Sequence, residues 1–182
     1  MFEYNVDDKI ILRIIERRHA EELFQVIVAN ADYVGKWLPF ARATTQVEDT
    51  ITYVNSALQD FASGRGLVAG MWYREKLVGT IGLHINKSHQ NASVGYWIDG
   101  SHEGKGIVTR ACQALISYAF EELNLHRIEI RASTGNSRSR AIPERLGFVE
   151  EGVVRGAFKL YDEFQDSVIY GMLRDDWNRI GS

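Results

Sequence analysis

The stretch from 93 to 133 constrains the fold most strongly, because two strand-like segments flank one long helical segment there. Residues SVGYWID (93–99) and HRIEIRAS (126–133) carry the β-branched and aromatic residues that are typical of strands. Between them, Gly104–Leu123 has apolar residues at helical spacing. Two strands that are joined by a helix of this length can pair in parallel. The sequence therefore predicts a central β–α–β crossover.

The rest of the chain alternates between strand and helix patterns. The predicted strands are 10–15, 67–73, 77–85, 93–99, 126–133, 148–154 and 167–173. The predicted helices are 18–29, 48–61, 104–123 and 137–146, and residues 34–40 are predicted to form a loop. Hairpins such as 67–73 with 77–85 pair in antiparallel fashion. We therefore predict a mixed α/β fold with a mostly antiparallel sheet around the crossover.

The composition, and the lack of a linker-like segment, indicate one globular domain over residues 1–182. Two prolines, Pro39 and Pro143, interrupt the chain, and no Ser/Gly-rich linker divides it. The formal net charge of −3 argues against a broad nucleic-acid surface. The first residues are acidic where a signal peptide is basic, and no apolar run approaches the ~20 residues that span a bilayer. The single cysteine, Cys112, fits a reducing compartment, so we expect a cytoplasmic protein that binds neither membrane nor nucleic acid directly.

A glycine–lysine–glycine turn stands at the start of the long predicted helix. Gly104 and Gly106 flank Lys105, and backbone with few bulky side chains lets consecutive N–H groups point at one anion. The helix dipole adds to this attraction. The turn suits a pyrophosphate, yet it is neither a dinucleotide fingerprint nor a P-loop, because both spacings are absent. By itself it is equally consistent with a plain helix start.

The segment around this turn resembles the GNAT superfamily of acetyl-CoA-dependent N-acetyltransferases. The family loop (Q/R)xxGx(G/A) corresponds to EGKGIV, with Glu103 in place of Gln/Arg and Val108 in place of a small residue. The resemblance implies that backbone amides here bind the coenzyme A pyrophosphate. Those amides belong to Gly104, Lys105, Gly106, Ile107, Val108 and Thr109. Glu103 is then expected to point away from the phosphates, because like charges repel.

A second motif lies downstream, where Asn136 and the later LGF (146–148) resemble the N-x-x-S/A…LGF helix of the same family. In the family this asparagine contacts the pantetheine arm, which lies between splayed fourth and fifth strands like an added strand. The resemblance thus implies a GNAT-like twisted sheet with those strands splayed and helices on both faces. It also implies that Asn136 and the backbone of Tyr96, Trp97 and Ile98 bind the arm, with core packing as the alternative for Tyr96 and Trp97.

Nearly the whole chain, from about Leu12 to Leu173, is similar to the RimJ/RimL group of ribosomal-protein N-terminal acetyltransferases. This implies an enzyme, an acyltransferase that moves an acetyl group from acetyl-CoA to a primary amine. The N-terminal α-amine of a ribosomal protein is the acceptor that the group suggests. Two alternatives stay open: acetylation of a small amine (a polyamine, an amino sugar or an antibiotic), and a non-catalytic acyl-CoA-binding module.

The catalytic groups depart from the family pattern. The tyrosine that many members place seven residues after the asparagine is Pro143 here, so Ser139 is the predicted donor to the leaving thiolate. A capping or surface serine is the equal alternative. The acidic residue that many relatives carry two positions before the strand glycine is Ser93 here. The remaining candidates for a base are His84, Asp99, Asp162, Glu163 and Asp166.

A site without a strong base favours a weakly basic acceptor. Removing a proton from a lysine at pH 7 costs about 4.6 kcal/mol, whereas an α-amine costs about 1 kcal/mol. Because no clear base stands in the sequence, the energetics favour an α-amine. This preference agrees with the resemblance to N-terminal acetyltransferases.

The acceptor side is predicted to be built from the N-terminal helices and from a β-hairpin between Tyr161 and Gln165. Large aromatic residues there predict its lining, with core packing as the alternative. The predicted lining is Tyr33, Trp37 and Phe164, together with Leu38 and Phe40, whereas Trp72 and Trp177 are predicted to lie in the core.

The five histidines show no metal-binding spacing, so no metal is predicted. Cys112 falls on the inner face of the long helix and is predicted to be a buried, inert thiol. The open sheet edge and the substrate loops are compatible with a homodimer.

Overall fold

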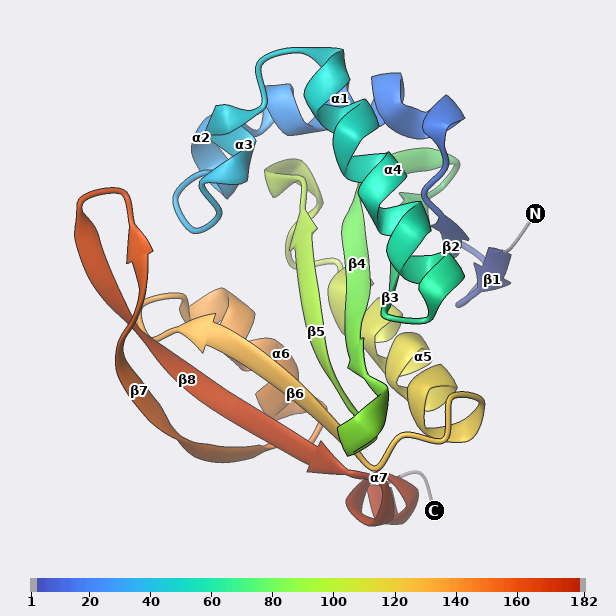
Figure 1. The fold of residues 1–182 in the computed structure, drawn as a ribbon, viewed down its shortest axis with the longest axis vertical. Helices are drawn as coiled ribbons and strands as arrows, with labels where there is room; N and C mark the ends of the chain where they lie inside the picture. Colours follow the sequence, from blue (N-terminus) through green and yellow to red (C-terminus); the bar gives the residue numbers. More distant parts are fainter. Residues whose placement is uncertain (1–2, 181–182) are drawn as a thin grey trace.

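The computed structural model describes residues 3–180, whose eight strands form one sheet (Figure 1). Across the sheet the strands stand in the order β1-β2-β3-β4-β5-β6-β8-β7. Their bounds are β1 Glu3–Asn5, β2 Ile10–Ile14, β3 Gly66–Tyr73, β4 Lys76–Asn86, β5 Asn91–Ile98, β6 Arg127–Ser133, β7 Val149–Leu160 and β8 Glu163–Leu173. The α-helices are α1 Ala20–Ala29, α2 Ala31–Val34, α3 Phe40–Ala43, α4 Val47–Ser63, α5 Ile107–Glu121, α6 Ser137–Arg145 and α7 Arg174–Ile180.

The pair β5–β6 is parallel, and the other neighbouring pairs of this sheet are antiparallel. The helix α5 connects the two parallel strands, which confirms the predicted β–α–β crossover. The mixed α/β fold with a mostly antiparallel sheet is likewise confirmed. The family's fourth and fifth strands correspond to β5 and β6.

The two parallel strands separate at one end. Their register stops at Val94↔Ile130, although β5 continues to Ile98 and β6 continues to Ser133. On their outer sides both strands stay paired, β5 with β4 and β6 with β8. The backbone groups that face each other across the separated ends are therefore not used by the sheet. This confirms the splayed strands that the resemblance implied.

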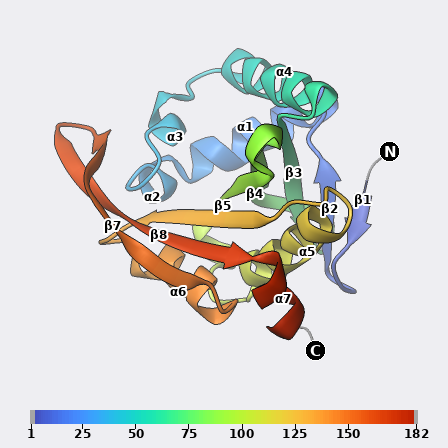
Figure 2. The same ribbon diagram turned by 60° about the horizontal axis from the view of Figure 1, so that its bottom comes forward.

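Helices cover both faces of the sheet (Figure 2). The helices α1 and α4 lie on one face, and α5, α6 and α7 lie on the other. The apolar stripe of α5 is buried, including Ala111, Leu115 and Ala119, as its spacing predicted. Trp72 is buried on the α1 and α4 side, and Trp177 packs against the core on the opposite side. Removing this apolar area from water is the main source of stability for such layers.

Four α-helical or strand segments, β1, α2, α3 and α7, were not predicted from the sequence. The strand β1 is short and exposed, and it forms because its backbone pairs with β2 rather than because it has an apolar face. The predicted loop 34–40 is confirmed for residues 35–39, which lie between the short, unpredicted helices α2 and α3. The helix α7 docks through Trp177, whose ring lies 6.2 Å from that of Phe120. These segments are too short for their periodicity to be recognised.

The last two strands are longer than predicted and form a hairpin that reaches the helices α2 and α3 (Figure 1). At its turn, the hydroxyl of Tyr161 donates a hydrogen bond to the carbonyl of Gly35. The guanidinium of Arg42 lies over the Tyr161 ring, 5.1 Å from its centroid. Apolar alternation fails to mark the extra length because almost every residue of β7 is exposed. The hairpin therefore makes a wall that extends away from the core.

Candidate active site

One cavity of about 1950 Å³ runs from the start of α5, past the splayed ends of β5 and β6, to a space between α4 and β7. Its wall includes Gly106 at the start of α5, Trp97 on β5, Ser133 on β6, Tyr53 on α4 and Phe158 on β7. We refer to the part around residues 102–110 and 136–145 as the helix mouth. We refer to the part bounded by α2, α3, α4 and β7 as the chamber.

The helix mouth is built on two glycines with left-handed backbone. Gly104 and Gly106 both have φ of +70°, and Gly106 is the N-cap of α5. A residue with a Cβ loses about 1 kcal/mol or more in this conformation. The first amides of a helix have no intrahelical acceptor, and no described side chain caps those of α5. The mouth therefore presents bare N–H groups, aided by the helix dipole, to an anion.

The residues predicted to bind the coenzyme converge on this cavity, with one exception. Those in its wall are Tyr96, Trp97, Ile98, Gly104, Gly106, Ile107, Val108, Thr109, Asn136 and Ser139. The exception is Lys105, whose Nζ lies 5.8 Å from the centre of the Tyr73 ring. Its side chain is directed to an aromatic face, which attracts a cation.

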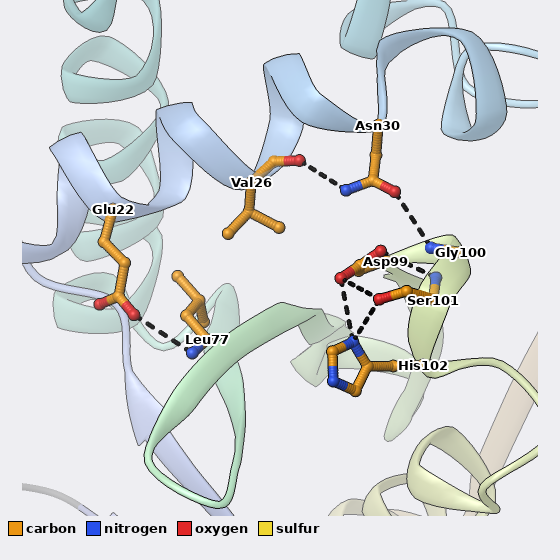
Figure 3. Close-up of polar contacts among 8 residues, drawn as sticks. All are labelled: Glu22, Val26, Asn30, Leu77, Asp99, Gly100, Ser101 and His102. Carbon is orange, nitrogen blue, oxygen red and sulfur yellow. Dashed lines mark hydrogen bonds and ion pairs between the residues drawn. The ribbon is translucent and has the colours of Figure 1, made fainter.

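The loop before the mouth is held to α1 (Figure 3). The amide of Gly100 donates to Asn30 Oδ1 at 3.0 Å. Asp99 accepts hydrogen bonds at 2.9 Å from the backbone amide and from the hydroxyl of Ser101, and lies 2.9 Å from His102 Nδ1. Burial opposes ionisation of Asp99, but these hydrogen bonds outweigh it and lower the pKa of the carboxyl. Asp99 therefore holds a turn beside the mouth.

Glu103 joins two elements across the edge of the mouth. One carboxylate oxygen accepts the hydroxyl of Tyr33 on α2, and the other contacts the guanidinium of Arg138 on α6. The charge of the acidic residue that departs from the family loop is thus compensated by a neighbouring cation. Sequence reasoning missed Arg138, because 35 positions separate it from Glu103.

Ser139 lies where the end of β5 approaches α6. Asn136 caps α6, since its Oδ1 accepts from the Ser139 amide at 3.1 Å. The Ser139 hydroxyl donates to the Tyr96 hydroxyl at 3.3 Å, and the Tyr96 hydroxyl donates to the Ser139 carbonyl at 3.0 Å. The cap of α6 is therefore made by Asn136, while the Ser139 side chain faces the cavity beside the splayed strands.

Two titratable groups near this point stay protonated at neutral pH. Burial is the main cause that raises the pKa of the Tyr96 phenol and the pKa of the Cys112 thiol. Tyr96 is therefore a hydrogen-bond donor and not a base. Cys112 is fully buried on α5, in agreement with the predicted inert thiol.

The residues predicted for the acceptor side divide into two groups. Tyr33, Trp37, Leu38 and Phe40 line the chamber. Phe164 lies outside the cavity wall and is 71% exposed at the hairpin turn. The reason is the length of β7 and β8, which carries the turn beyond the chamber. Tyr161, predicted as the start of this hairpin but not as a lining residue, contacts Gly35 at the end of α2 instead.

Of the five candidates for a base, His84 lies in the cavity wall, and Asp99, Asp162, Glu163 and Asp166 lie outside it. The wall as described holds two other carboxylates, Asp49 and Glu103. Asp49 accepts the amides of Thr45 and Gln46 at the start of α4, at 2.9 and 3.2 Å. Both wall carboxylates therefore already have partners. The cations of the wall are Lys36, Arg110, Arg131, Arg138 and Arg145.

Two buried hydroxyls in the wall have no partner in the described part of the chain. They belong to Thr50 on α4 and Ser133 at the end of β6. Leaving such a group unpaired costs about 1–3 kcal/mol, so an unpaired hydroxyl in a cavity wall suits a ligand or water. The alternation of β6, which places Ser133 on the same face as Glu129 and Arg131, was the sequence signal for this residue.

Within residues 3–180, no cluster of three or more His, Cys, Asp or Glu side chains could hold a metal ion. In the same range, no helix has the length and apolar character needed to cross a membrane.

The structure thus combines a splayed pair of parallel strands, a helix mouth with bare amides at their open end and a chamber beyond, so that one cavity has room for two substrates. Residues 9–149 match the family described as an acetyltransferase (GNAT) domain. The chain therefore belongs to the GNAT acetyltransferase family and is an enzyme, an acyltransferase.

Curated relatives match along nearly the whole chain. The protein named "Putative ribosomal N-acetyltransferase YdaF" from Bacillus subtilis (strain 168) is 41% identical, over 97% of this chain and 98% of the relative. The ribosomal-protein-serine acetyltransferase of Escherichia coli (strain K12) is 28% identical, over 93% of this chain and 96% of the relative. The whole chain is thus similar to proteins that carry acetyltransferase names.

Solved structures share the fold. The crystal structure of a protein titled "Probable acetyltransferase" superposes with a TM-score of 0.93 at 40% identity, over 97% of this chain and 99% of that one. The microcin C7 self-immunity acetyltransferase MccE, in complex with acetyl-CoA and AMP, has a TM-score of 0.89 at 28% identity, over 92% of this chain and 94% of that one. The mixed α/β GNAT fold is therefore confirmed.

Proposed function

We propose that the protein transfers the acetyl group of acetyl-CoA to the N-terminal α-amine of a protein, with ribosomal proteins as the first candidates. Coenzyme binding is supported by the bare amides at Gly104 and Gly106 and by the acetyl-CoA complex of the similar MccE structure. The ribosomal candidates are supported by the names of the Bacillus subtilis and Escherichia coli relatives.

The charge of the cavity wall is the observation that supports an α-amine as the acceptor. Its two described carboxylates already have partners: Asp49 accepts the amides just before α4, and Glu103 contacts Tyr33 and Arg138. Lys36 and Arg145 add positive charge to the wall. A polyamine or an aminoglycoside carries several positive charges and needs uncompensated carboxylates. A single α-amine loses its proton at a cost of about 1 kcal/mol at pH 7. The wall therefore favours an α-amine over a polycation.

The residues of the site suit direct transfer. Acetyl-CoA supplies an activated acetyl group as a thioester. The chamber holds the neutral amine, whose nitrogen bonds to the thioester carbon while the carbon–sulfur bond breaks. A backbone amide near Ile98, at the splayed end of β5, donates to the oxygen that becomes negative. The Ser139 hydroxyl, which donates to the Tyr96 hydroxyl at 3.3 Å in this structure, turns to donate to the departing sulfur, and the nitrogen passes its proton to water or to that sulfur.

Coenzyme release tests the proposal directly. The enzyme is mixed with acetyl-CoA and with a panel of peptides that carry the N-termini of ribosomal proteins, and free thiol is measured. We expect turnover with peptides that have a free α-amine and none with the same peptides after N-terminal blocking. Turnover with spermidine or an aminoglycoside, but with no peptide, contradicts the proposal and supports a small-amine acceptor. Acetyl-CoA binding without turnover on any acceptor supports a non-catalytic module.

A further inference from the structure

Each of the two splayed strands leads into a glycine, and the two glycines occupy equivalent positions. Gly100 stands two residues after the last residue of β5, and Gly135 stands two residues after the last residue of β6. The ladder between these strands stops at Val94↔Ile130. The pairing of β5 with β6 therefore does not fix the distance between the two glycines, and another part of the molecule has to fix it.

Two aromatic rings of one short segment contact these glycines. A Cβ added to Gly100 would lie 3.1 Å from Cγ of Tyr33, which belongs to α2. A Cβ added to Gly135 would lie 3.4 Å from Cη2 of Trp37, four residues further along the chain. Because neither glycine has a side chain, each ring packs directly on the backbone that follows one of the splayed strands.

The segment that carries both rings is held in shape by hydrogen bonds. The amide of Trp37 donates to the Val34 carbonyl at 3.0 Å, which closes the turn after α2. Asn30, the N-cap residue of α2, accepts the Gly100 amide through Oδ1 at 3.0 Å (Figure 3). Residues 30–37, which we call the brace, thus form one short piece that is attached beside the end of β5 and beside the end of β6.

The groups that the transfer needs stand on both sides of this opening. The proposed oxyanion donor near Ile98 belongs to β5, whereas Ser139, the proposed donor to the sulfur, belongs to α6 and follows Gly135 by four residues. The Tyr96 hydroxyl joins the two sides by its hydrogen bond to the Ser139 carbonyl. The brace joins them at the chamber. A displacement of about 1 Å between groups of this kind lowers a transfer rate by up to about 100-fold.

We propose that Tyr33 and Trp37 are positioning residues, which hold the open ends of β5 and β6 at the separation that the reacting thioester requires. The inference rests on the proposed function, because it takes the thioester to lie between these strands. Tyr33 fixes the end of β5 through Gly100, and Trp37 fixes the end of β6 through Gly135. The two rings act as a pair, since a brace that is released at one end no longer sets the distance. Their role therefore extends beyond lining the chamber.

A double-mutant cycle tests whether the two rings act as a pair. For Tyr33→Ala, Trp37→Ala and the double variant, kcat is measured at a saturating concentration of peptide, and the dissociation constant of acetyl-CoA is measured without acceptor. We expect each single variant to lower kcat about tenfold and to weaken acetyl-CoA binding about threefold. Because either change releases the brace, the double variant is expected to lie within about twofold of the single variants. Losses that multiply to about 100-fold in kcat, or a wild-type kcat in either single variant, overturn the brace.

Two control variants separate bracing from other roles of these aromatic residues. Tyr33→Phe keeps the ring on Gly100 and removes only the hydroxyl that Glu103 accepts, so it is expected to restore kcat to within about twofold of the wild type. Phe40→Ala removes another chamber ring, 6.0 Å from the Trp97 ring, and is expected to raise KM for the peptide with unchanged acetyl-CoA binding. The brace is contradicted if Tyr33→Phe is as slow as Tyr33→Ala, or if Phe40→Ala weakens acetyl-CoA binding as much as Trp37→Ala does.

Gly135→Val tests the same contact from the other side and leaves both rings in the protein. Gly135 is not in the left-handed region, and the methyl groups of valine take the space of the Trp37 ring. We expect kcat to fall about tenfold, as in Trp37→Ala, and the combination of the two changes to add less than about twofold. A wild-type kcat in Gly135→Val overturns the brace while leaving acetyl transfer intact. A wild-type protein that neither binds nor consumes acetyl-CoA is instead a failure of the proposed function, on which the brace rests.

Discussion

The helix mouth and the chamber, the two ends of one cavity, are specified by the chain in different ways. The amides of the mouth come from one contiguous stretch, in which Gly104 and Gly106 aim the amides that follow them. The wall of the chamber comes from α2, α3, α4, β6 and β7, which span most of the chain. A site made of backbone amides can therefore be recognised from a short motif, whereas a site made of converging side chains requires the fold.

One residue of the mouth, Glu103, does not fit this distinction between a local site and a site made by the fold. Glu103 belongs to the contiguous loop, yet its carboxylate is held by Tyr33 on α2 and Arg138 on α6. The mouth thus depends on a tertiary contact for its charge balance, although its amides are local. Variants at the two ends can show how far the mouth and the chamber act separately.

The largest effect is expected from Gly106→Glu. A carboxylate and a Cβ at a position with φ of +70° place charge and bulk where the phosphate is expected. We predict that acetyl-CoA binding weakens at least about 100-fold by calorimetry. Gly106→Asn is the control for backbone strain, because asparagine tolerates this conformation, and it is expected to bind within about tenfold of the wild type. Unchanged affinity in Gly106→Glu contradicts the location of the coenzyme site.

The next effect concerns the tertiary contact of the mouth. Arg138→Ala leaves Glu103 uncompensated beside a bound anion, and we predict an acetyl-CoA affinity about tenfold lower, or about 1.4 kcal/mol. Glu103→Gln in the same protein is predicted to restore most of this loss.

A matched control separates this pairing from the loss of one positive charge. Arg145→Ala removes a cation from the same helix and cavity wall without touching Glu103. It is expected to weaken binding less, and Glu103→Gln is not expected to rescue it. If Glu103→Gln fails to rescue Arg138→Ala, the mouth is independent of its tertiary partner.

Ser139→Ala tests the junction between the mouth and the chamber. If the hydroxyl donates to the departing sulfur, kcat falls about tenfold, while the dissociation constant of acetyl-CoA changes less than about twofold. Asn136→Ala is the comparison variant, because it removes the cap of α6 and is expected to lower the melting temperature. If Ser139→Ala has the same kcat as the wild type, the Ser139 hydroxyl takes no part in the transfer step.

The smallest effect is expected at the hairpin wall of the chamber. Tyr161→Phe removes the hydrogen bond to Gly35, and we predict an increase of about threefold in KM for the peptide acceptor. The affinity for acetyl-CoA is expected to stay unchanged, because the hairpin turn lies away from the mouth. Phe164→Ala, at the same turn, is the control and is predicted to change neither constant. If Phe164→Ala raises the KM for the peptide more than Tyr161→Phe does, Phe164 belongs to the acceptor site.

Much of the fold was predictable because long elements carry strong periodicity. The helices α4 and α5 and the strands β3 to β6 were predicted close to their observed bounds, and their order defined the crossover. The strand β1 and the outer part of β7 carry no apolar alternation, since they are exposed. They are formed by backbone pairing with a neighbouring strand, which single-chain periodicity does not record.

The candidate site could also be predicted in part, where its residues belong to a local motif. Apart from Lys105, the residues predicted to bind the coenzyme line the cavity, and Tyr33 and Trp37 line the chamber. The turn lies within the predicted hairpin of residues 161–165, but Phe164 is outside the wall because the long strands β7 and β8 carry that turn beyond the chamber. Arg138 and Ser133 were missed because their roles depend on what lies opposite them.

The sequence by itself determined the local features of this protein: the crossover, the amphipathic helices and the glycine turn. Each of these follows from backbone preferences and side-chain periodicity within a few residues. Only the tertiary structure decided which cation compensates Glu103, how far the hairpin reaches and which face of β4 to β6 stays uncovered. These contacts join residues that are distant in the chain, so strand register and helix packing set them, and neither is encoded in a short stretch of sequence.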